Sequence, residues 1–148
     1  MADQNNPTNR KVDMMTVKAP HKMLRTVLMF DAATCFAFGL LLCLGAGPLA
    51  SLFGLPTDLL LFAGLILFPC AVLMFVVAKQ PNPSLALVWL IILGNLGWVL
   101  GSIAILILPI GAPTAIGYGF VIMQALGVLG IAAFEYRTIA RHSLSPAA

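Results

Sequence analysis

LRTVLMFDAATCFAFGLLLCLGA, residues 24–46, is the stretch that decides the fold class of this chain. Its 23 residues match the roughly 20 that a helix needs to cross the hydrocarbon core of a bilayer. Basic residues precede the stretch and small residues follow it, as in a cleaved signal peptide. The apolar part of a signal peptide has only about 7–15 residues, however. We therefore favour an uncleaved transmembrane helix over a signal peptide.

Three more apolar runs follow, at residues 59–78, 85–108 and 116–136. The 148-residue chain is 61% hydrophobic and only 9% charged, whereas a soluble domain is about one quarter charged. These features predict an all-α integral membrane four-helix bundle. We expect a polar tail over residues 1–22, a transmembrane domain over 23–137 and a short tail over 138–148.

The positive charges predict the orientation of the bundle. If the four runs are threaded as hairpins, all the Lys and Arg residues fall on one side of the membrane: Arg10, Lys11, Lys18, Lys22, Arg25, Lys79, Arg137 and Arg141. Cytoplasmic segments carry an excess of Lys and Arg, so both termini are predicted to be cytoplasmic. No basic stripe with interleaved aromatic residues suggests nucleic-acid binding. The expected partner is the lipid bilayer, with a homo-oligomer or a larger membrane complex as further candidates.

The connection GPLASLFGLPT, residues 47–57, is expected to form a short helix along the outer interface. Pro48 suits a helix start, and Gly54 suits a helix end. Thr57 and Asp58 are expected to cap the second span with their side chains. The stretches Gly54–Thr57 (GLPT) and Gly111–Thr114 (GAPT) resemble each other, which we attribute to shared capping chemistry more than to an internal duplication.

Five polar or ionisable side chains within the apolar runs form the candidate intramembrane site: Asp31, Asn95, Trp98, Gln124 and Glu135. Ionisable groups inside a membrane are costly, so each is a candidate for function. Asp31 lies about 10 Å along the helix from the cytoplasmic end of its run. A structural pairing, for example with Arg25, and a functional role for Asp31 are equally open.

The other members of this set suggest helix–helix contacts. Asn95 and Gln124 should lie at similar depth, so we expect a hydrogen bond between them that joins two helices. The indole N–H of Trp98 should find Asn95 or Ser102 as its acceptor.

Glu135, near the cytoplasmic end of the fourth run, is expected to pair at the interface with Arg137 and Arg141.

Small residues mark the faces where helices are expected to pack closely. Gly39 belongs to such a stripe in the first run. Gly94, Gly97 and Gly101 form another in the third run.

No catalytic constellation is visible in the sequence. Cys35, Cys43 and Cys70 lie inside apolar runs without a Cys-x-x-Cys pair, so neither a disulfide framework nor a metal or redox site is expected. We expect no cofactor and no enzymatic activity of the chain's own, although a role as a subunit of a membrane enzyme stays open.

Several short motifs resemble a group of small four-helix bacterial inner-membrane proteins with DoxX-like architecture. They are Arg25 with Asp31-Ala32-Ala33, Gly47-Pro48-Leu49, Gly54-Leu55-Pro56, Asn95 with Trp98-Val99, and Glu135-Tyr136. The resemblance covers about residues 24–137 and implies a bacterial inner-membrane location, without an established activity or catalytic residues.

Two function classes remain after these exclusions. The first is a non-catalytic role as an accessory subunit or as a structural or lipophilic-ligand-binding membrane protein. The second is a small proton-coupled transporter of hydrophobic cations, in which Asp31 would be the proton-coupled carboxylate. Small multidrug transporters resemble the chain in having four helices and an acidic residue in the first. The chain departs from them in its long first outer connection and one-sided charge.

Overall fold

A computed structural model describes residues 21–143 of the chain. The predicted tails over residues 1–20 and 144–148, with Arg10, Lys11 and Lys18, lie outside the described residues. The described part is all-helical, with no strand. Its elements, in chain order, are α2 (His21–Leu44), α3 (Ala46–Phe53), α4 (Thr57–Lys79), α5 (Leu85–Ile107) and α6 (Ala115–Ser143).

Four of these helices, α2, α4, α5 and α6, are long and apolar enough to cross a membrane. The chain is therefore a multi-pass membrane protein by helix length and composition, as predicted. Helix boundaries differ from the prediction at two places in particular. The first span ends at Leu44, two residues before its predicted end, and the short helix predicted within residues 47–57 is α3, with Pro48 in its first turn. The last helix continues past residue 136 to Ser143.

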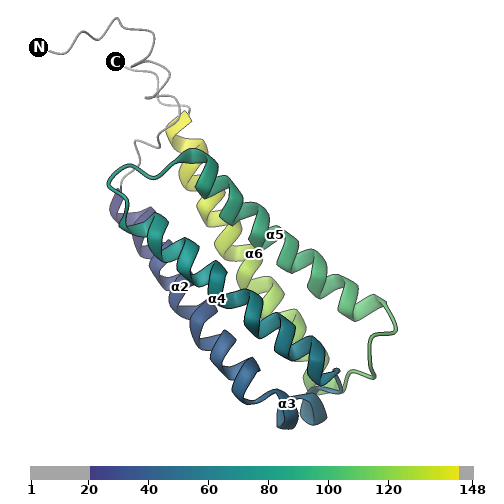
Figure 1. Cartoon of the computed structure of the whole chain (residues 1–148). Coiled ribbons are helices and arrows are strands. Elements are labelled where there is room, and N and C mark those ends of the chain that lie inside the picture. Colours follow the sequence, from purple (N-terminus) through teal and green to yellow (C-terminus); the bar gives the residue numbers. More distant parts are fainter. Residues whose placement is uncertain (1–20, 144–148) are drawn as a thin grey trace, which may run out of the picture.

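The long helices form two antiparallel pairs, α2 with α4 and α5 with α6, which lie next to each other in an elongated bundle (Figure 1). The α2–α4 pair is close-packed because glycines face each other. A Cβ atom on Gly39 would lie 3.1 Å from the backbone oxygen of Gly64. Gly39 therefore lies at a close helix contact, between α2 and α4.

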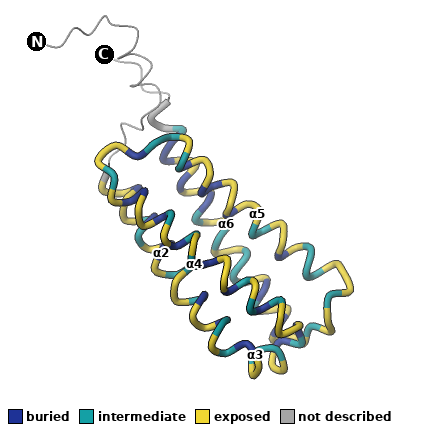
Figure 2. Tube along the Cα trace, viewed as in Figure 1, coloured by how far each residue is buried: buried dark blue, intermediate teal, exposed yellow. Residues whose placement is uncertain are grey.

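The buried residues form two clusters at opposite ends of the bundle (Figure 2). One cluster lies where α2 begins and includes Leu24, Leu28, Val77, Val88 and Ile139. The other lies beside α3 and includes Leu42, Phe53, Leu60, Leu67 and Val121. The interior between these two hydrophobic cores contains polar side chains.

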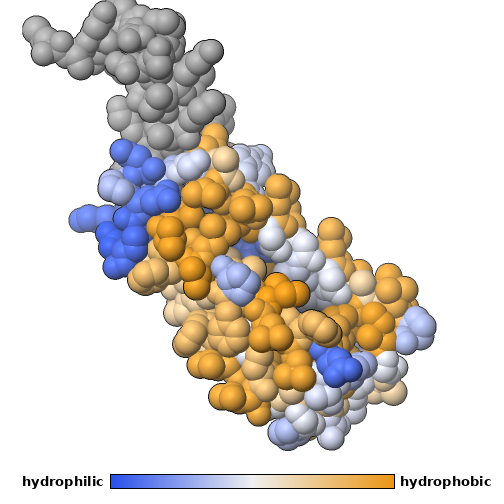
Figure 3. All heavy atoms as spheres, in the orientation of Figure 1, coloured by the Kyte–Doolittle hydropathy of each residue, from blue (hydrophilic) through white to orange (hydrophobic). Residues whose placement is uncertain are grey.

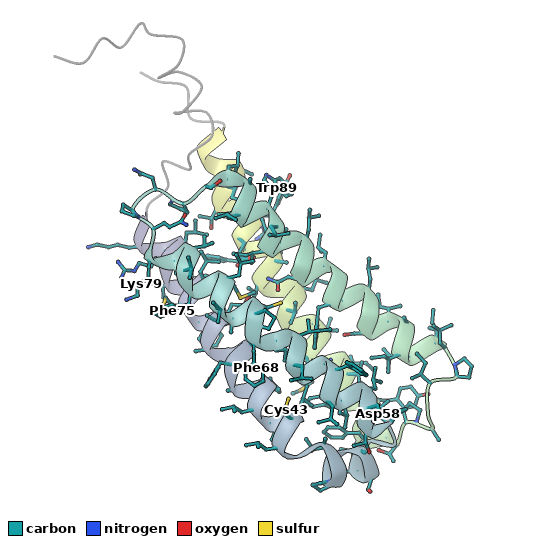
Figure 4. The ribbon with its side chains drawn as sticks, viewed as in Figure 1. Cys43, Asp58, Phe68, Phe75, Lys79 and Trp89 are labelled. Atoms are coloured by element: carbon teal, nitrogen blue, oxygen red, sulfur yellow. The ribbon has the colours of Figure 1, made fainter. Side chains whose placement is uncertain are left out.

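The outer surface suits a lipid solvent. Hydrophobic side chains cover most of the face in Figure 3, and hydrophilic atoms gather at the end where α2 begins and α4 ends. At that end Lys79 lies over the ring of Phe75, with its Nζ 5.3 Å from the ring centroid. Asp58 lies at the opposite end of α4 (Figure 4). Lys79 in the last turn and Asp58 in the first both interact favourably with the helix dipole.

Two loops at the α3 end join the helix pairs through backbone hydrogen bonds. Ala112 N donates to Gly54 O at 3.0 Å, and Thr114 N donates to Phe53 O at 2.9 Å. The Thr114 hydroxyl also donates to Leu52 O at 2.7 Å. We call this contact, between residues 52–54 and 112–114, the loop clasp. It pairs backbone groups of the two loops with each other and leaves fewer of them unsatisfied.

The two similar loop stretches thus contact each other, and both contain a left-handed glycine. Gly54 has φ 69° and Gly111 has φ 77°, a conformation that glycine adopts without steric cost. The capping prediction holds for only one stretch. Thr114 Oγ1 accepts a hydrogen bond from Gly117 N at 3.1 Å at the start of α6. The side-chain cap predicted for Thr57 and Asp58 is wrong, because α4 already begins at Thr57 and its N-cap is Pro56.

We predict that Gly54→Ala lowers the free energy of unfolding by about 2–4 kcal/mol. The new Cβ would need a left-handed backbone and would collide with the carbonyl group of Ala112. Gly47→Ala in α3 is the matched control, because nothing lies within 4 Å of its Cβ position. Reversible unfolding in mixed micelles measures both variants, and equal stability of the two would contradict a structural role for the clasp.

Candidate intramembrane binding site

Polar side chains from three helices meet in the bundle interior. The side-chain amide of Asn95 (α5) donates to Asp31 Oδ2 (α2) at 3.2 Å and to Glu135 Oε2 (α6) at 3.3 Å. All three side chains are buried: Asp31 is 2% exposed, Asn95 is 6% exposed and Glu135 is 0% exposed. We call them the carboxyl–amide triad. Asp31 and Asn95 meet because α2 and α5 run in the same direction, and each residue lies ten positions beyond the start of its helix.

A second polar pair continues from the triad along α5 and α6. The indole Nε1 of Trp98 donates to Gln124 Oε1 at 3.2 Å. The Ser102 hydroxyl donates to the backbone oxygen of Trp98 at 2.9 Å. The hydrogen-bond partners therefore differ from those expected. Asn95 bonds to the two carboxyl groups and not to Gln124, and Gln124 accepts from Trp98 instead. The position of each residue along its helix indicated which residues could meet, but it did not indicate the direction in which each side chain points.

Glu135 does not occupy the interfacial position expected from the sequence. It is fully buried, and its Oε1 has no hydrogen-bond partner. No Lys or Arg side chain among residues 22–140 forms an ion pair with Glu135 or with Asp31, so the pairings of Asp31 with Arg25 and of Glu135 with Arg137 are not found. The side chain of Arg141, the other expected partner of Glu135, lies outside the described ones. The physical reason at Glu135 is helix length. Because α6 runs on to Ser143, Glu135 lies well inside the helix instead of at its end.

A cavity of about 700 Å³ lies between the two helix pairs and reaches Asp31 and Asn95. Its walls come from α2, α4, α5 and α6, and they are mostly apolar. The polar groups on the walls include Asp31, Thr34, Asn95, Trp98 and Gln124. Glu135 does not line the cavity, so it lies behind Asn95 when viewed from the cavity.

Aromatic residues define the end of the cavity nearest α3. Phe38 and Phe120 line it, with their ring centroids 6.1 Å apart. Phe120 in turn stacks on Phe53, 4.5 Å between centroids, beside the loop clasp. The clasp therefore fixes the residue that closes this end.

The cavity opens sideways onto the lipid-facing surface. Three of its lining residues, Phe30, Leu90 and Met123, are 65%, 53% and 76% exposed. A side chain that both lines the cavity and faces outward marks an opening. A ligand could therefore enter from the bilayer as well as along the bundle.

The glycine stripe of α5 does not lie at the close helix–helix contact that was predicted for it. Nothing lies within 4 Å of the Cβ positions of Gly94, Gly97 and Gly101, so no described helix packs closely against them. Gly94 instead lines the cavity. Gly94 therefore leaves space beside Asn95, where α5 stands away from α4 (Figure 1), whereas Gly97 and Gly101 are exposed and do not line the cavity.

Sequence reasoning missed two cysteines and two aromatic residues as parts of the site. Cys35 and Cys70 line the cavity, and the Cys35 thiol approaches Asp31 Oδ1 at 3.8 Å. The spacing of Cys35 four residues after Asp31 was the available signal. Cys70, Phe38 and Phe120 carried no such signal. No group of three or more His, Cys, Asp or Glu residues within residues 21–143 is arranged to hold a metal ion.

No protein family, curated protein or solved structure matches this chain. The class of multi-pass membrane protein therefore rests on the helices alone, and no family match supports the DoxX-like resemblance.

We predict that Asn95→Leu lowers the free energy of unfolding by about 2–4 kcal/mol, because two buried carboxyl groups lose their shared donor. Ser102→Ala is the matched control in the same helix. It is 3% exposed, but its hydroxyl bonds only within α5, so its loss should cost less than about 1 kcal/mol. Unfolding in mixed micelles compares the two. A milder effect at Asn95 than at Ser102 would argue against a tie between helices at the triad.

Proposed function

We propose that this protein binds a lipophilic ligand in the cavity between its two helix pairs. The observation that carries the proposal is the combination of an apolar cavity of about 700 Å³ with a few polar groups on its walls. Ligand sites typically have about 300–1,000 Å³, mainly apolar walls and a small number of polar groups that fix orientation. The apolar part of the ligand would lie against Phe38, Leu67 and Phe120, and its polar part near Asp31 and Asn95.

The proposal includes no catalytic role for the chain. Most polar groups of the cavity are held by hydrogen bonds to neighbouring groups, and the Cys35 thiol donates to Asp31 Oδ1 at 3.8 Å. Asn95 and Trp98 bond to their neighbours, and the Thr34 hydroxyl donates to Phe30 O at 2.9 Å. A role as the ligand-binding or structural subunit of a larger complex fits the same geometry. A homo-oligomer would also be compatible with it.

A second candidate is proton-coupled transport of hydrophobic cations through the same cavity. The observation that favours it is the position of Asp31, which is 2% exposed yet lines the cavity. A carrier would have to release the ligand on the other side of the membrane, whereas a binding protein would not. Uptake distinguishes the two functions.

We predict that a lipophilic ligand in the cavity changes the fluorescence of Trp98 and leaves Trp89 unaffected. Trp98 lines the cavity, whereas Trp89 is 39% exposed and packs edge-on against Tyr136, with ring centroids 6.0 Å apart. The single-tryptophan variants Trp89→Phe and Trp98→Phe therefore form a matched pair. Titration with a short-chain brominated lipophile should saturate only in the variant that keeps Trp98.

Equal, non-saturating quenching in both variants would mean that the probe merely dissolves in the micelle. For the transport alternative, the protein is reconstituted in vesicles with a pH gradient, and uptake of a lipophilic cation is compared with that of Asp31→Asn. Saturable binding without gradient-driven uptake favours the binding protein.

We also propose a bacterial inner-membrane location, as the DoxX-like resemblance implies, with both termini in the cytoplasm and α3 at the outer interface. The described Lys and Arg residues support this orientation. Arg25, Lys79 and Arg137 lie near the start of α2, the end of α4 and the end of α6, which share one end of the bundle (Figure 1). Excess basic charge favours the cytoplasmic side.

We predict that a fluorescent protein fused after residue 148 is bright, and that alkaline phosphatase fused there is inactive. The matched control is the same pair of reporters inserted in the loop between α5 and α6, where the outcome should reverse. Active phosphatase at the C-terminus would overturn the orientation.

A further inference from the structure

The carboxyl–amide triad has more acceptors than donors. An amide group has two hydrogens, and Asn95 directs both to carboxyl oxygens. The remaining oxygen of Asp31 has only a thiol donor at 3.8 Å. The remaining oxygen of Glu135 is buried and has no partner at all. Nearly all buried polar groups in proteins are hydrogen-bonded, so this atom marks a missing donor or cation.

The groups facing the triad do not supply that positive charge. On α2 they are Asp31 and the Cys35 thiol, and on α4 the nearest titratable group that lines the cavity is the Cys70 thiol. Asn95 is the contribution of α5, and Glu135 that of α6. No Lys or Arg among residues 22–140 pairs with either carboxyl group. Two like charges at one buried site cannot both persist uncompensated, because the low dielectric strengthens their repulsion.

We propose that the carboxyl–amide triad is a binding site for one monovalent positive charge in the membrane interior. The site combines Asp31, which the cavity reaches, with Glu135, which lies behind Asn95 and which the cavity does not reach. A proton, an alkali cation and the ammonium head group of a lipophilic amine would all supply the same charge. Each neutralises one carboxylate and leaves the other bonded to Asn95.

The triad shares Asp31 and Asn95 with the proposed lipophilic site, but binding of a positive charge is a separate property from binding of a lipophile to the apolar walls. A neutral lipophile that quenches Trp98 would support the proposed function even if no positive charge binds. A cation response without such quenching would support the triad alone.

The test measures the thermal unfolding midpoint of the purified full chain in three series. The first varies Li⁺, Na⁺ and K⁺ at fixed pH against a bulky organic cation. The second lowers the pH in the bulky cation alone. The third adds a long-chain primary amine or the alcohol of equal chain length. We expect at least one source of positive charge to raise the midpoint of the wild type, and the responding series identifies the source.

The variants Asp31→Asn and Glu135→Gln should each abolish that response, because each leaves only one carboxyl group beside Asn95. Both keep the size of the side chain, so both are expected to fold. Asp58→Asn is the matched control and should keep the response, since Asp58 lies at the far end of α4. The infrared band of protonated carboxyl groups, lost in Glu135→Gln, would report a bound proton directly. Absence of any response in the wild type, or a response that survives in either triad variant, overturns the proposal.

Discussion

The loop clasp is the contact on which the arrangement of this bundle depends. Within each helix pair the long helices pack side by side, but the two pairs stand partly apart along the cavity. The clasp fixes their separation at one end with backbone hydrogen bonds from Ala112 and Thr114 to residues of the α3 end. A buried backbone polar group without a partner costs about as much free energy as a lost hydrogen bond, so these bonds favour the joined arrangement. Two left-handed glycines allow the loops to approach closely enough to form them.

The carboxyl–amide triad joins the helices by hydrogen bonds in the bundle interior. Asn95 joins α5 to α2 and α6 through carboxyl groups on both. In hydrocarbon such a tie keeps polar atoms together, because separating the helices would leave them unpaired. The apolar cavity lies between the clasp and the triad, so its size follows from how far apart these two contacts hold the helix pairs.

Much of the fold could be predicted because lipid leaves few alternatives. A long apolar run must be a helix, so the four spanning helices follow from composition. The sequence did not show which helices pair, because hydropathy is nearly uniform around each one. The stripe of Gly94, Gly97 and Gly101 suggested a helix contact, yet α5 leaves that face open. Small residues permit close approach without requiring it.

The sequence predicted the position of the candidate site residues along the bundle axis, but not their hydrogen-bond partners. Polar residues inside the runs could be recognised one by one, and helix rise placed them along the bundle axis. Bonds such as Trp98–Gln124 depend on side-chain rotation and helix phase, which one sequence does not encode visibly. Glu135 was placed at the interface because the fourth run loses its apolar character near residue 136. Buried Thr138 and Ile139 show that α6 continues as a packed helix beyond it.

The sideways opening beside Phe30, Leu90 and Met123 affects the ligand affinity that an experiment in water would measure. A molecule that arrives through the bilayer is first concentrated there by partitioning, which gains about 0.8 kcal/mol for each buried CH₂ group. The protein then needs to discriminate only between lipid and its own apolar wall, a small difference. A site of this kind would have low intrinsic affinity and high apparent affinity measured from water. The length of the ligand's apolar chain would set the occupancy, and the polar groups that line the cavity would set the choice among ligands of equal length.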